Sequence, residues 1–142
     1  MSRRMERDEW RAFVSAGTRT GKVGVTRTNG APHVVPIWFV LDGDDFVFTT
    51  HIDTVKGKAI RRDGRLALCV DDERPPYSFV TVEGTASTSV DAGELLYWAT
   101  KIGARYMGED RSEEFGRRNA APGEMVVRVI PARIVATADM AD

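Results

Sequence analysis

The hydrophobic and polar positions follow two different periods along the chain. Over residues 4–16, Trp10, Phe13 and Val14 recur at helical spacing, which predicts an amphipathic helix. From Lys22 to Arg27 apolar and polar residues alternate, as they do in a half-buried strand. We therefore expect one short helix followed by extended structure.

A hairpin and an unusually apolar strand come next. Asn29-Gly30 predicts a type I′ hairpin turn, because both central residues of that turn need a positive φ. The strand expected over 32–41 must be covered on both sides. Its two faces are Val35, Ile37 and Phe39 on one side, and Val34, Trp38 and Val40 on the other. Pro36 cannot donate a ladder hydrogen bond, so we expect an open edge or a bulge there.

The rest of the pattern predicts further strands joined mostly by short turns. Strands are expected over 46–50, 65–70, 77–87, 124–130 and 132–138, with helices from Asp53 or Thr54 to Arg62, over 91–107 and over 112–119. Gly84 lies inside a strand and indicates a bulge or a close approach of backbone. About seven strands without a βαβ alternation favour a small, mostly antiparallel barrel of the α+β class.

Composition narrows the possible classes of protein. The 142 residues, 42% hydrophobic and 29% charged, are typical of one domain spanning 1–142. A formal net charge of -1 argues against a general nucleic-acid binder. Cys69 is the single cysteine and cannot form a disulfide framework. Without a signal peptide or an apolar run of about 20 residues, we expect a cytoplasmic protein with no membrane partner.

The sequence contains no familiar catalytic constellation, so we assign no catalytic residue. His33 and His51 are far apart and have no second imidazole or cysteine at ligand spacing, so no metal site is expected. Cys69 lies in an apolar strand and is interpreted as an inert buried thiol. No nucleophile elbow or glycine-rich phosphate loop occurs. Such a chain suits a binding module, or an enzyme whose cofactor supplies the chemistry.

Positive charge gathers in the segment that follows Thr49-Thr50. Residues 54–65 hold five cations and one anion, at the start of a predicted helix. Hydroxyls, ammonium groups and the free N–H groups of a helix N-terminus together make a phosphate cradle. Lys56 and Lys58 both reach one phosphate only from the loop or the first turn. The alternative is a solvated cationic helix face, which we favour for Arg61-Arg62.

Pro36 and Trp38 form a second candidate for ligand binding. A strand broken by proline leaves a gap in the barrel wall, and Trp38 offers a flat apolar surface to a ring system. The alternative, which these residues favour when taken by themselves, is that Trp38 belongs to the core or to a subunit contact.

Four short motifs occur in a recognisable order. They are Gly30-x-Pro32-x-x-x-Pro36-x-Trp38-Phe39, Phe46-x-Phe48-Thr49-Thr50, Lys56-x-Lys58-x-Ile60 and Val82-x-Gly84-x-Ala86. Their order and spacing resemble the pyridoxamine-phosphate-oxidase-like split-barrel superfamily over 10–138. Within it, the chain is most similar to the flavin/deazaflavin-dependent oxidoreductases of the B group. The resemblance implies a split β-barrel, FMN-binding-like, of six to seven antiparallel strands with peripheral helices. It also implies a homodimer with the cofactor between subunits.

The resemblance assigns cofactor-binding roles to two segments. Thr50, Lys56 and Lys58 match the positions that hold the cofactor's phosphate, and the strand 35–38 matches the one that lies along the ring. The full expected set is Val35, Pro36, Ile37, Trp38, Thr49, Thr50, Lys56, Gly57 and Lys58. Tyr77 and Arg105-Tyr106 would approach from the partner subunit or cover the site.

The implied function is an oxidoreductase that transfers hydride from reduced deazaflavin coenzyme F-420. Its substrate would be a small electrophilic molecule of enone, quinone or tetrapyrrole type. The alternatives are an FMN-dependent oxidoreductase and a non-catalytic carrier of flavin, deazaflavin or haem. The family's B6 oxidases end with an Arg-Leu motif and a terminal proline, which does not follow Arg133-Ile134-Val135, so vitamin B6 oxidation is not expected. An RNA-binding barrel is disfavoured because the cationic segment lacks interleaved aromatic residues.

Overall fold

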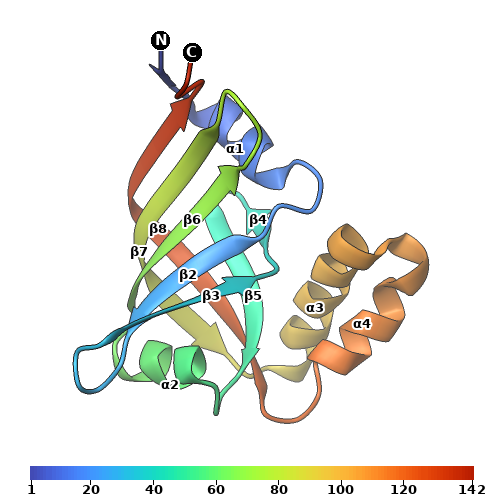
Figure 1. The fold of residues 1–142 in the computed structure, drawn as a ribbon. Helices are drawn as coiled ribbons and strands as arrows, with labels where there is room; N and C mark the ends of the chain where they lie inside the picture. The colour runs from blue at the N-terminus through green and yellow to red at the C-terminus, as the bar shows by residue number, and fades with distance from the viewer.

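Eight β-strands form one curved antiparallel sheet that does not close into a complete barrel (Figure 1). The structure, a computed structural model, describes residues 1–142. The strands follow the order β3-β2-β6-β7-β8-β5-β4, and β1 pairs with the end of β8. Their bounds are β1 Arg3–Arg4, β2 Gly21–Thr26, β3 Pro32–Ile37, β4 Val40–Asp42, β5 Asp45–His51, β6 Arg65–Asp72, β7 Ser78–Ser89 and β8 Glu124–Ala138. The predicted fold class is confirmed.

Four α-helices accompany the sheet. They are α1 Arg7–Ser15, α2 Val55–Arg62, α3 Ala92–Met107 and α4 Ser112–Asn119, with a short 3-10 helix, Glu109–Arg111, between the last two. Figure 1 shows α1 and α2 near opposite ends of the sheet, and α3 and α4 packed together at its side. None of these helices combines the length and the apolar character that crossing a membrane requires.

The helix ends follow from local sequence. The Asp91 carboxylate accepts a hydrogen bond of 2.9 Å from the Glu94 N–H and caps the N-terminus of α3. Gly108, with a φ of 101°, ends the same helix. The first helix begins at Arg7 rather than at residue 4, because Arg3–Arg4 pairs instead with the end of β8.

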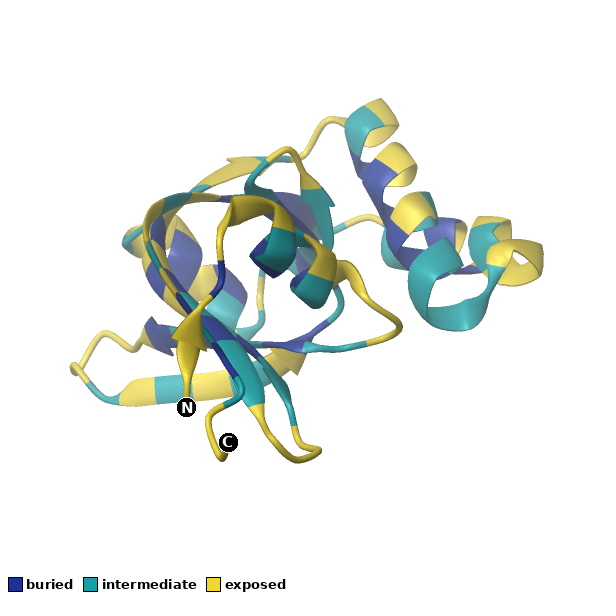
Figure 2. Ribbon diagram, turned by 90° about the horizontal axis from the view of Figure 1, so that it is seen from above, coloured by how far each residue is buried: buried dark blue, intermediate teal, exposed yellow.

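The hydrophobic core lies inside the curve of the sheet. Phe39, Phe46 and Phe48 are fully buried there, and the Trp10 ring of α1 stacks on Phe46 with 6.1 Å between centroids. Figure 2 shows the buried positions on the inner side of the sheet and on the inward face of α1. Each such buried side chain stabilises the fold by about 1.5–3 kcal/mol.

The split in the sheet lies between two strands that are consecutive in the chain. β3 and β4 are the edges of the sheet, and only Trp38 and Phe39 separate them. The single strand predicted over 32–41 is therefore wrong, because the chain leaves one edge and joins the other within two residues. The open edge expected at Pro36 is confirmed: it pairs with Lys22 on one side and has no strand on the other.

The hairpin between β2 and β3 is confirmed, but its turn is not type I′. Gly30 has a φ of 86°, whereas Asn29 does not have a positive φ. The Gly30 N–H donates to the Arg27 carbonyl at 2.9 Å, and the Asn29 side chain accepts from the Ala31 N–H at 3.0 Å. A longer loop with one left-handed glycine thus replaces the two-residue turn.

The bulge predicted at Gly84 is confirmed, and it explains an error in the predicted C-terminal strands. β8 is one strand instead of two. Gly84 pairs with Pro131 while Glu83 pairs with Arg133, so Ala132 is the extra residue of the bulge. The missing N–H of Pro131 falls where the ladder is already irregular, and the strand continues through it.

Candidate functional site

One cavity of about 440 Å³ brings together much of the predicted site. It lies where the split of the sheet meets the end of β5 and the start of α2. Its lining comprises Thr20, Pro36, Ile37, Trp38, Thr49, Thr50, His51, Thr54, Lys56, Ile102, Asn119 and Glu124. The two segments predicted from the sequence, the Pro36–Trp38 strand and the cationic segment, therefore face one space.

Three of the predicted residues do not line this cavity. Val35 packs against the hydrophobic core, and Lys58 is exposed on the surface of α2. Gly57 is buried, and a Cβ there would come too close to the His51 carbonyl oxygen. Its contribution is to allow a tight turn. Contact of Val35, Gly57 or Lys58 with a ligand stays a prediction.

A network of hydroxyls organises the β5–α2 corner, by which we mean Thr49–Lys58. Thr54 is the N-cap of α2: its Oγ1 accepts from the Gly57 N–H at 3.0 Å and donates to the His51 carbonyl at 2.9 Å. The Thr50 hydroxyl, only 4% exposed, lies 3.0 Å from the Thr54 Oγ1 and is thus the donor of that bond. The corner holds two hydroxyls at the start of a helix in fixed orientations.

Lys56 supplies the positive charge of the cavity. Its ammonium group is half-buried and takes part in no ion pair and no side-chain hydrogen bond. Burial lowers the pKa of Lys56, and the nearby Glu124 carboxylate partly opposes that shift. An unpaired, half-buried cation beside two hydroxyls is suited to an anionic ligand group.

His51 and Glu124 occupy the same end of the cavity. They face each other across β5 and β8. The His51 Nδ1 accepts from the Asp53 N–H at 3.1 Å, so the neutral ring carries its proton on Nε2. Burial raises the pKa of Glu124, and His51 and Lys56 oppose that shift. The end of the cavity that holds the cation therefore also holds a carboxyl group.

Trp38 lines the other part of the cavity and packs against α3. Its indole stacks on the Tyr106 ring, with 5.1 Å between centroids and an interplanar angle of 3°. The Tyr106 hydroxyl accepts from the Phe39 N–H at 3.2 Å and donates to the Arg19 carbonyl at 2.7 Å. Phe115 of α4 packs against the same indole at 6.0 Å. The indole orientation is therefore fixed by distant parts of the chain.

Arg105 reinforces this arrangement. Its guanidinium donates to the carbonyl oxygens of Phe39 and Val14, both at 2.7 Å, and of Gly17 at 3.0 Å. Burial lowers the pKa of Arg105, but an arginine stays charged throughout the pH range of proteins. We call Trp38, Phe39, Arg105 and Tyr106 the Trp38 cluster. It fixes the backbone at the split of the sheet, where no hydrogen bonds between β3 and β4 can do so.

Arg105 and Tyr106 bind Phe39 of their own chain, and the Tyr106 ring stacks on Trp38. The expectation that they approach a partner's site or cover the site stays a prediction. Tyr77 does not line the cavity. Its carbonyl accepts from the Met140 N–H at 2.9 Å, and Figure 1 shows the C-terminus at the opposite end of the sheet from α2.

Several lining residues were not identified from the sequence. These are Thr20, His51, Thr54, Ile102, Asn119 and Glu124. They come from the residue before β2, the β5–α2 corner, α3, α4 and β8. No regular spacing along the chain links them. Only Thr54 carried a local signal, as a helix N-cap residue next to the cationic segment.

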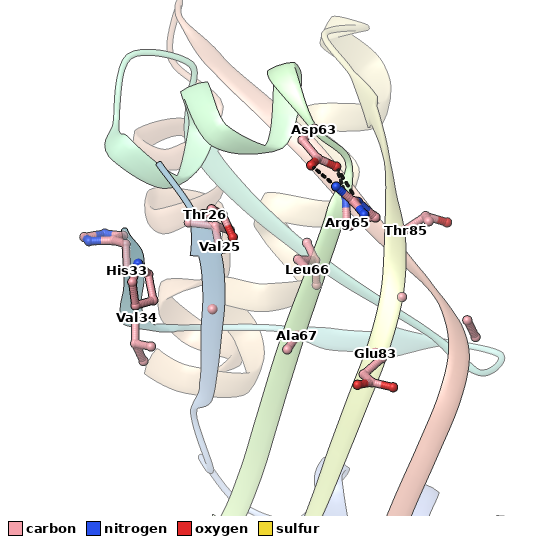
Figure 3. Close-up of a pocket in the computed structure, with 14 residues that line it drawn as sticks. Val25, Thr26, His33, Val34, Asp63, Arg65, Leu66, Ala67, Glu83 and Thr85 are labelled. Carbon is pink, nitrogen blue, oxygen red and sulfur yellow. Dashed lines mark hydrogen bonds and ion pairs between the residues drawn. The ribbon is translucent and has the colours of Figure 1, made fainter. Parts of the chain in front are cut away.

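A second, larger cavity of about 690 Å³ lies on the outer face of the sheet. Its lining includes Val34, Ala67 and Glu83, which come from β3, β6 and β7, and Figure 3 shows the Asp63–Arg65 ion pair at the opposite end of the cavity from them. None of the predicted cofactor-binding residues lines it. Val34 is 67% exposed on this face, so the expected cover on both sides of its strand is not supplied within one chain.

Cys69 also lies on the outer face and is half-buried, not buried as predicted. It alternates with Leu68 and Val70, which point into the core. Burial raises the pKa of the Cys69 thiol, and the neighbouring Asp71 adds to the shift. A raised pKa disfavours the thiolate, so the expectation of low reactivity keeps its physical basis.

The sequence and the fold of this chain are similar to those of known proteins. The sequence model described as pyridoxamine 5'-phosphate oxidase matches residues 7–138. No curated protein matches the chain. Among solved structures, the conserved hypothetical protein Rv2991 from Mycobacterium tuberculosis has a TM-score of 0.83 at 22% identity, covering 93% of this chain and 84% of its own.

Two further solved structures share the fold. An F-420 reductase has a TM-score of 0.68 at 22% identity, covering 87% of this chain and 94% of its own. A FAD-binding protein from Mesorhizobium loti has a TM-score of 0.71 at 15% identity, covering 96% of this chain and 97% of its own. At these identities the likeness concerns the fold alone.

Proposed function

The chain belongs to the pyridoxamine 5'-phosphate oxidase family, and from that premise we propose that it is an oxidoreductase that uses the deazaflavin coenzyme F-420. Its substrate is a small electrophilic molecule of enone, quinone or tetrapyrrole type. The observation that carries the proposal is the shared cavity, in which Trp38 and the unpaired ammonium of Lys56 face one space. The F-420 reductase of the same fold supports this choice of cofactor.

The lining of the cavity fits a ligand that has a flat ring and an anionic tail. Pro36, Ile37 and Trp38 present an apolar surface suited to a ring. Thr49, Thr50 and Lys56 present hydroxyls and a cation suited to a phosphate. These two groups of residues come from the two segments that the sequence predicts to bind the cofactor.

In this proposal the side chains bind and orient, and they perform no covalent step. When bound, a reduced deazaflavin supplies the hydride that saturates an activated double bond. Lys56 and the threonine hydroxyls fix the anionic end of the ligand, which sets its position along the cavity. Trp38, itself held by Tyr106, limits the tilt of a ring placed against it.

Titration with F-420 and with FMN tests the proposal. The purified protein is titrated with each cofactor while tryptophan fluorescence is recorded. Lys56→Ala is expected to weaken F-420 binding by about 1–3 kcal/mol, because a charge-assisted hydrogen bond is lost. Lys101→Ala, which removes a lysine that lies over Tyr97 and outside the cavity, is the matched control and should not change the affinity. Lys58→Ala tests whether the exposed lysine contributes.

Activity is measured as oxidation of reduced F-420 by a panel of enones, quinones and tetrapyrroles. Binding of FMN alone favours the FMN-dependent oxidoreductase, and binding without turnover of any substrate favours a carrier. A protein that binds haem and neither ring cofactor would support the haem-carrier alternative. The absence of affinity for both F-420 and FMN overturns the proposal.

The proposal includes a homodimer. Its support is the outer face of the sheet, where Val34 and Ala67 are exposed beside both positive and negative charges, Arg65 and Glu83. A patch that carries both signs can face its own copy across a two-fold axis. Light scattering coupled to gel filtration measures the mass. Val34→Asp should shift the protein to the monomer, while Val90→Asp, at a 73% exposed position outside the patch, should not. A monomeric wild type contradicts this part of the proposal.

A further inference from the structure

Glu124 is a carboxyl group at the end of the cavity that is otherwise arranged for an anion. It is the first residue of β8 and pairs with His51, the last residue of β5. Directly opposed residues of antiparallel strands point to one face, with Cβ atoms about 4.5–5.5 Å apart. Both side chains line the cavity together with Lys56. The Glu124 carboxylate takes part in no ion pair and no side-chain hydrogen bond within the chain.

The charges that face Glu124 are few. Lys56 approaches from α2 and His51 from β5, and Asp53 lies behind His51 with 3.9 Å between the His51 Nδ1 and its carboxylate. The remaining polar residues of the lining carry no charge. They are Thr20, Thr49, Thr50, Thr54 and Asn119. Ionised Glu124 therefore offsets much of the positive charge that Lys56 offers to a ligand.

We infer that Glu124 opposes Lys56 within this cavity, so that a phosphate-bearing ligand binds with uptake of a proton at the Glu124 carboxyl. This inference rests on the proposed function, because it assumes that a phosphate-bearing cofactor occupies the cavity. A phosphate placed against Lys56 brings a second negative charge toward Glu124. Protonation of Glu124 removes the repulsion and leaves Lys56 free to bind the phosphate.

The direction of the pH dependence follows from linkage. Burial already raises the pKa of Glu124 in the free protein, and a bound phosphate raises it further. Ligand affinity is therefore highest below the pKa of Glu124 in the free protein. It falls as the pH rises from that pKa to the higher pKa of Glu124 in the complex. Above the higher pKa the affinity is constant again. The fall is at most tenfold for each pH unit, since a single proton is taken up.

Calorimetric titration tests the inference, with FMN as the probe or, if the protein binds F-420 and not FMN, with F-420. Wild type and Glu124→Gln are compared between pH 5 and 8, in two buffers of different ionisation enthalpy, which reports the number of protons taken up. Wild type should take up a proton on binding, in addition to any taken up by the phosphate, whose second pKa is about 6. Glu124→Gln should lose the additional uptake and bind FMN about tenfold more tightly at the upper end of the range.

Two controls separate this inference from other causes. Glu83→Gln removes a carboxylate on the outer face and should behave as wild type. Riboflavin, which has the same ring and no phosphate, should bind wild type and Glu124→Gln with the same pH dependence. An unchanged proton uptake in Glu124→Gln overturns the inference, as does weaker FMN binding, which would mean that Glu124 accepts a hydrogen bond from the ligand. If wild type binds no FMN and no F-420, the proposed function has failed instead.

Discussion

Two parts of the same cavity are built in opposite ways. The β5–α2 corner draws its hydroxyls, its lysine and its helix cap from one continuous segment, Thr49–Lys58. The Trp38 cluster joins residues that are 66 to 91 positions apart, through hydrogen bonds that Arg105 and Tyr106 share with Phe39, Val14 and Arg19. The first part depends on a local turn, and the second on tertiary packing. Substitutions in the two parts should therefore differ in their effects on stability and on ligand affinity.

The largest effect is expected at the Trp38 cluster. Tyr106→Ala removes the ring that stacks on Trp38 and the hydroxyl that bonds to Phe39 and Arg19. We expect the free energy of unfolding to fall by about 3–5 kcal/mol, because a large half-buried side chain is truncated. Tyr106→Phe should cost about 1–2 kcal/mol, since only the hydroxyl is lost.

Urea unfolding of the two Tyr106 variants measures these changes. Tyr97→Ala is the control, because Tyr97 lies on the same helix and is 52% exposed. A change of less than about 0.5 kcal/mol is expected for such a surface position. If Tyr106→Ala were no more harmful than Tyr97→Ala, the cluster would not hold the split of the sheet.

A smaller effect is expected in the β5–α2 corner. Gly57→Ala places a Cβ against the His51 carbonyl oxygen, which is backbone and cannot move aside easily. We expect a loss of about 1–3 kcal/mol, as for other overpacked positions. Because the strain is local, FMN or F-420 affinity should fall while the tryptophan emission spectrum of the free protein stays unchanged.

Gly93→Ala provides the matched control for that substitution. Gly93 lies in the first turn of α3, and an added Cβ would have its nearest neighbour at 3.5 Å, an ordinary contact distance. Alanine is favoured over glycine in a helix by about 0.5–1 kcal/mol, so this variant should be as stable as wild type or more stable. Equal stability of Gly57→Ala and wild type would contradict the tight turn described for the corner.

The next effect concerns the helix cap. Thr54→Ala removes the oxygen that accepts from the Gly57 N–H and the hydroxyl that donates to the His51 carbonyl. Loss of an N-cap costs about 0.5–2 kcal/mol. Thr54→Ser keeps the hydroxyl and should retain most of the stability. Thermal unfolding of both variants measures the difference, and identical melting of the Ala and Ser forms would show that the cap contributes nothing.

The same contrast explains what could be predicted from the sequence. The corner was predicted in part because Thr49-Thr50 and Lys56 lie close together in the chain, ahead of a recognisable helix. Thr20, Ile102, Asn119 and Glu124 could not be found, because only the pairing of distant strands and helices brings them to the cavity. The role of Tyr106 in supporting Trp38 depends on the same long-range packing.

The fold shows the same limit. The helices over 91–107 and 112–119 were predicted closely, since caps and apolar spacing are local signals. The break at Trp38-Phe39 was missed because it depends on which strands become the edges of the sheet. The continuity of β8 through Pro131 was missed for a related reason. Its missing N–H is tolerated because Pro131 lies at the bulge of β8, where the ladder with β7 is already irregular.

The smallest expected effect distinguishes the two parts of the cavity by pH. Between pH 4 and 8 the Trp38 cluster should not change its charge: burial raises the pKa of Tyr106 above its ordinary value, and Arg105 stays charged. Beside the β5–α2 corner, on β8, the pKa of Glu124 is higher in the folded than in the unfolded chain. Its contribution to stability is therefore complete below the unfolded value of about 4.3 and is lost as the pH rises through the folded value.

Melting temperatures of wild type and Glu124→Gln, compared across that pH range, test this contrast. Near pH 4 the two proteins should melt together, because both side chains are then largely neutral. As the pH rises, the variant should become the more stable one, since a neutral amide avoids the desolvation of a carboxylate. The difference between Tyr106→Phe and wild type should stay constant over the same range. A pH-dependent difference at Tyr106, or a constant one at Glu124, would remove the distinction between a titrating and a non-titrating part of the cavity.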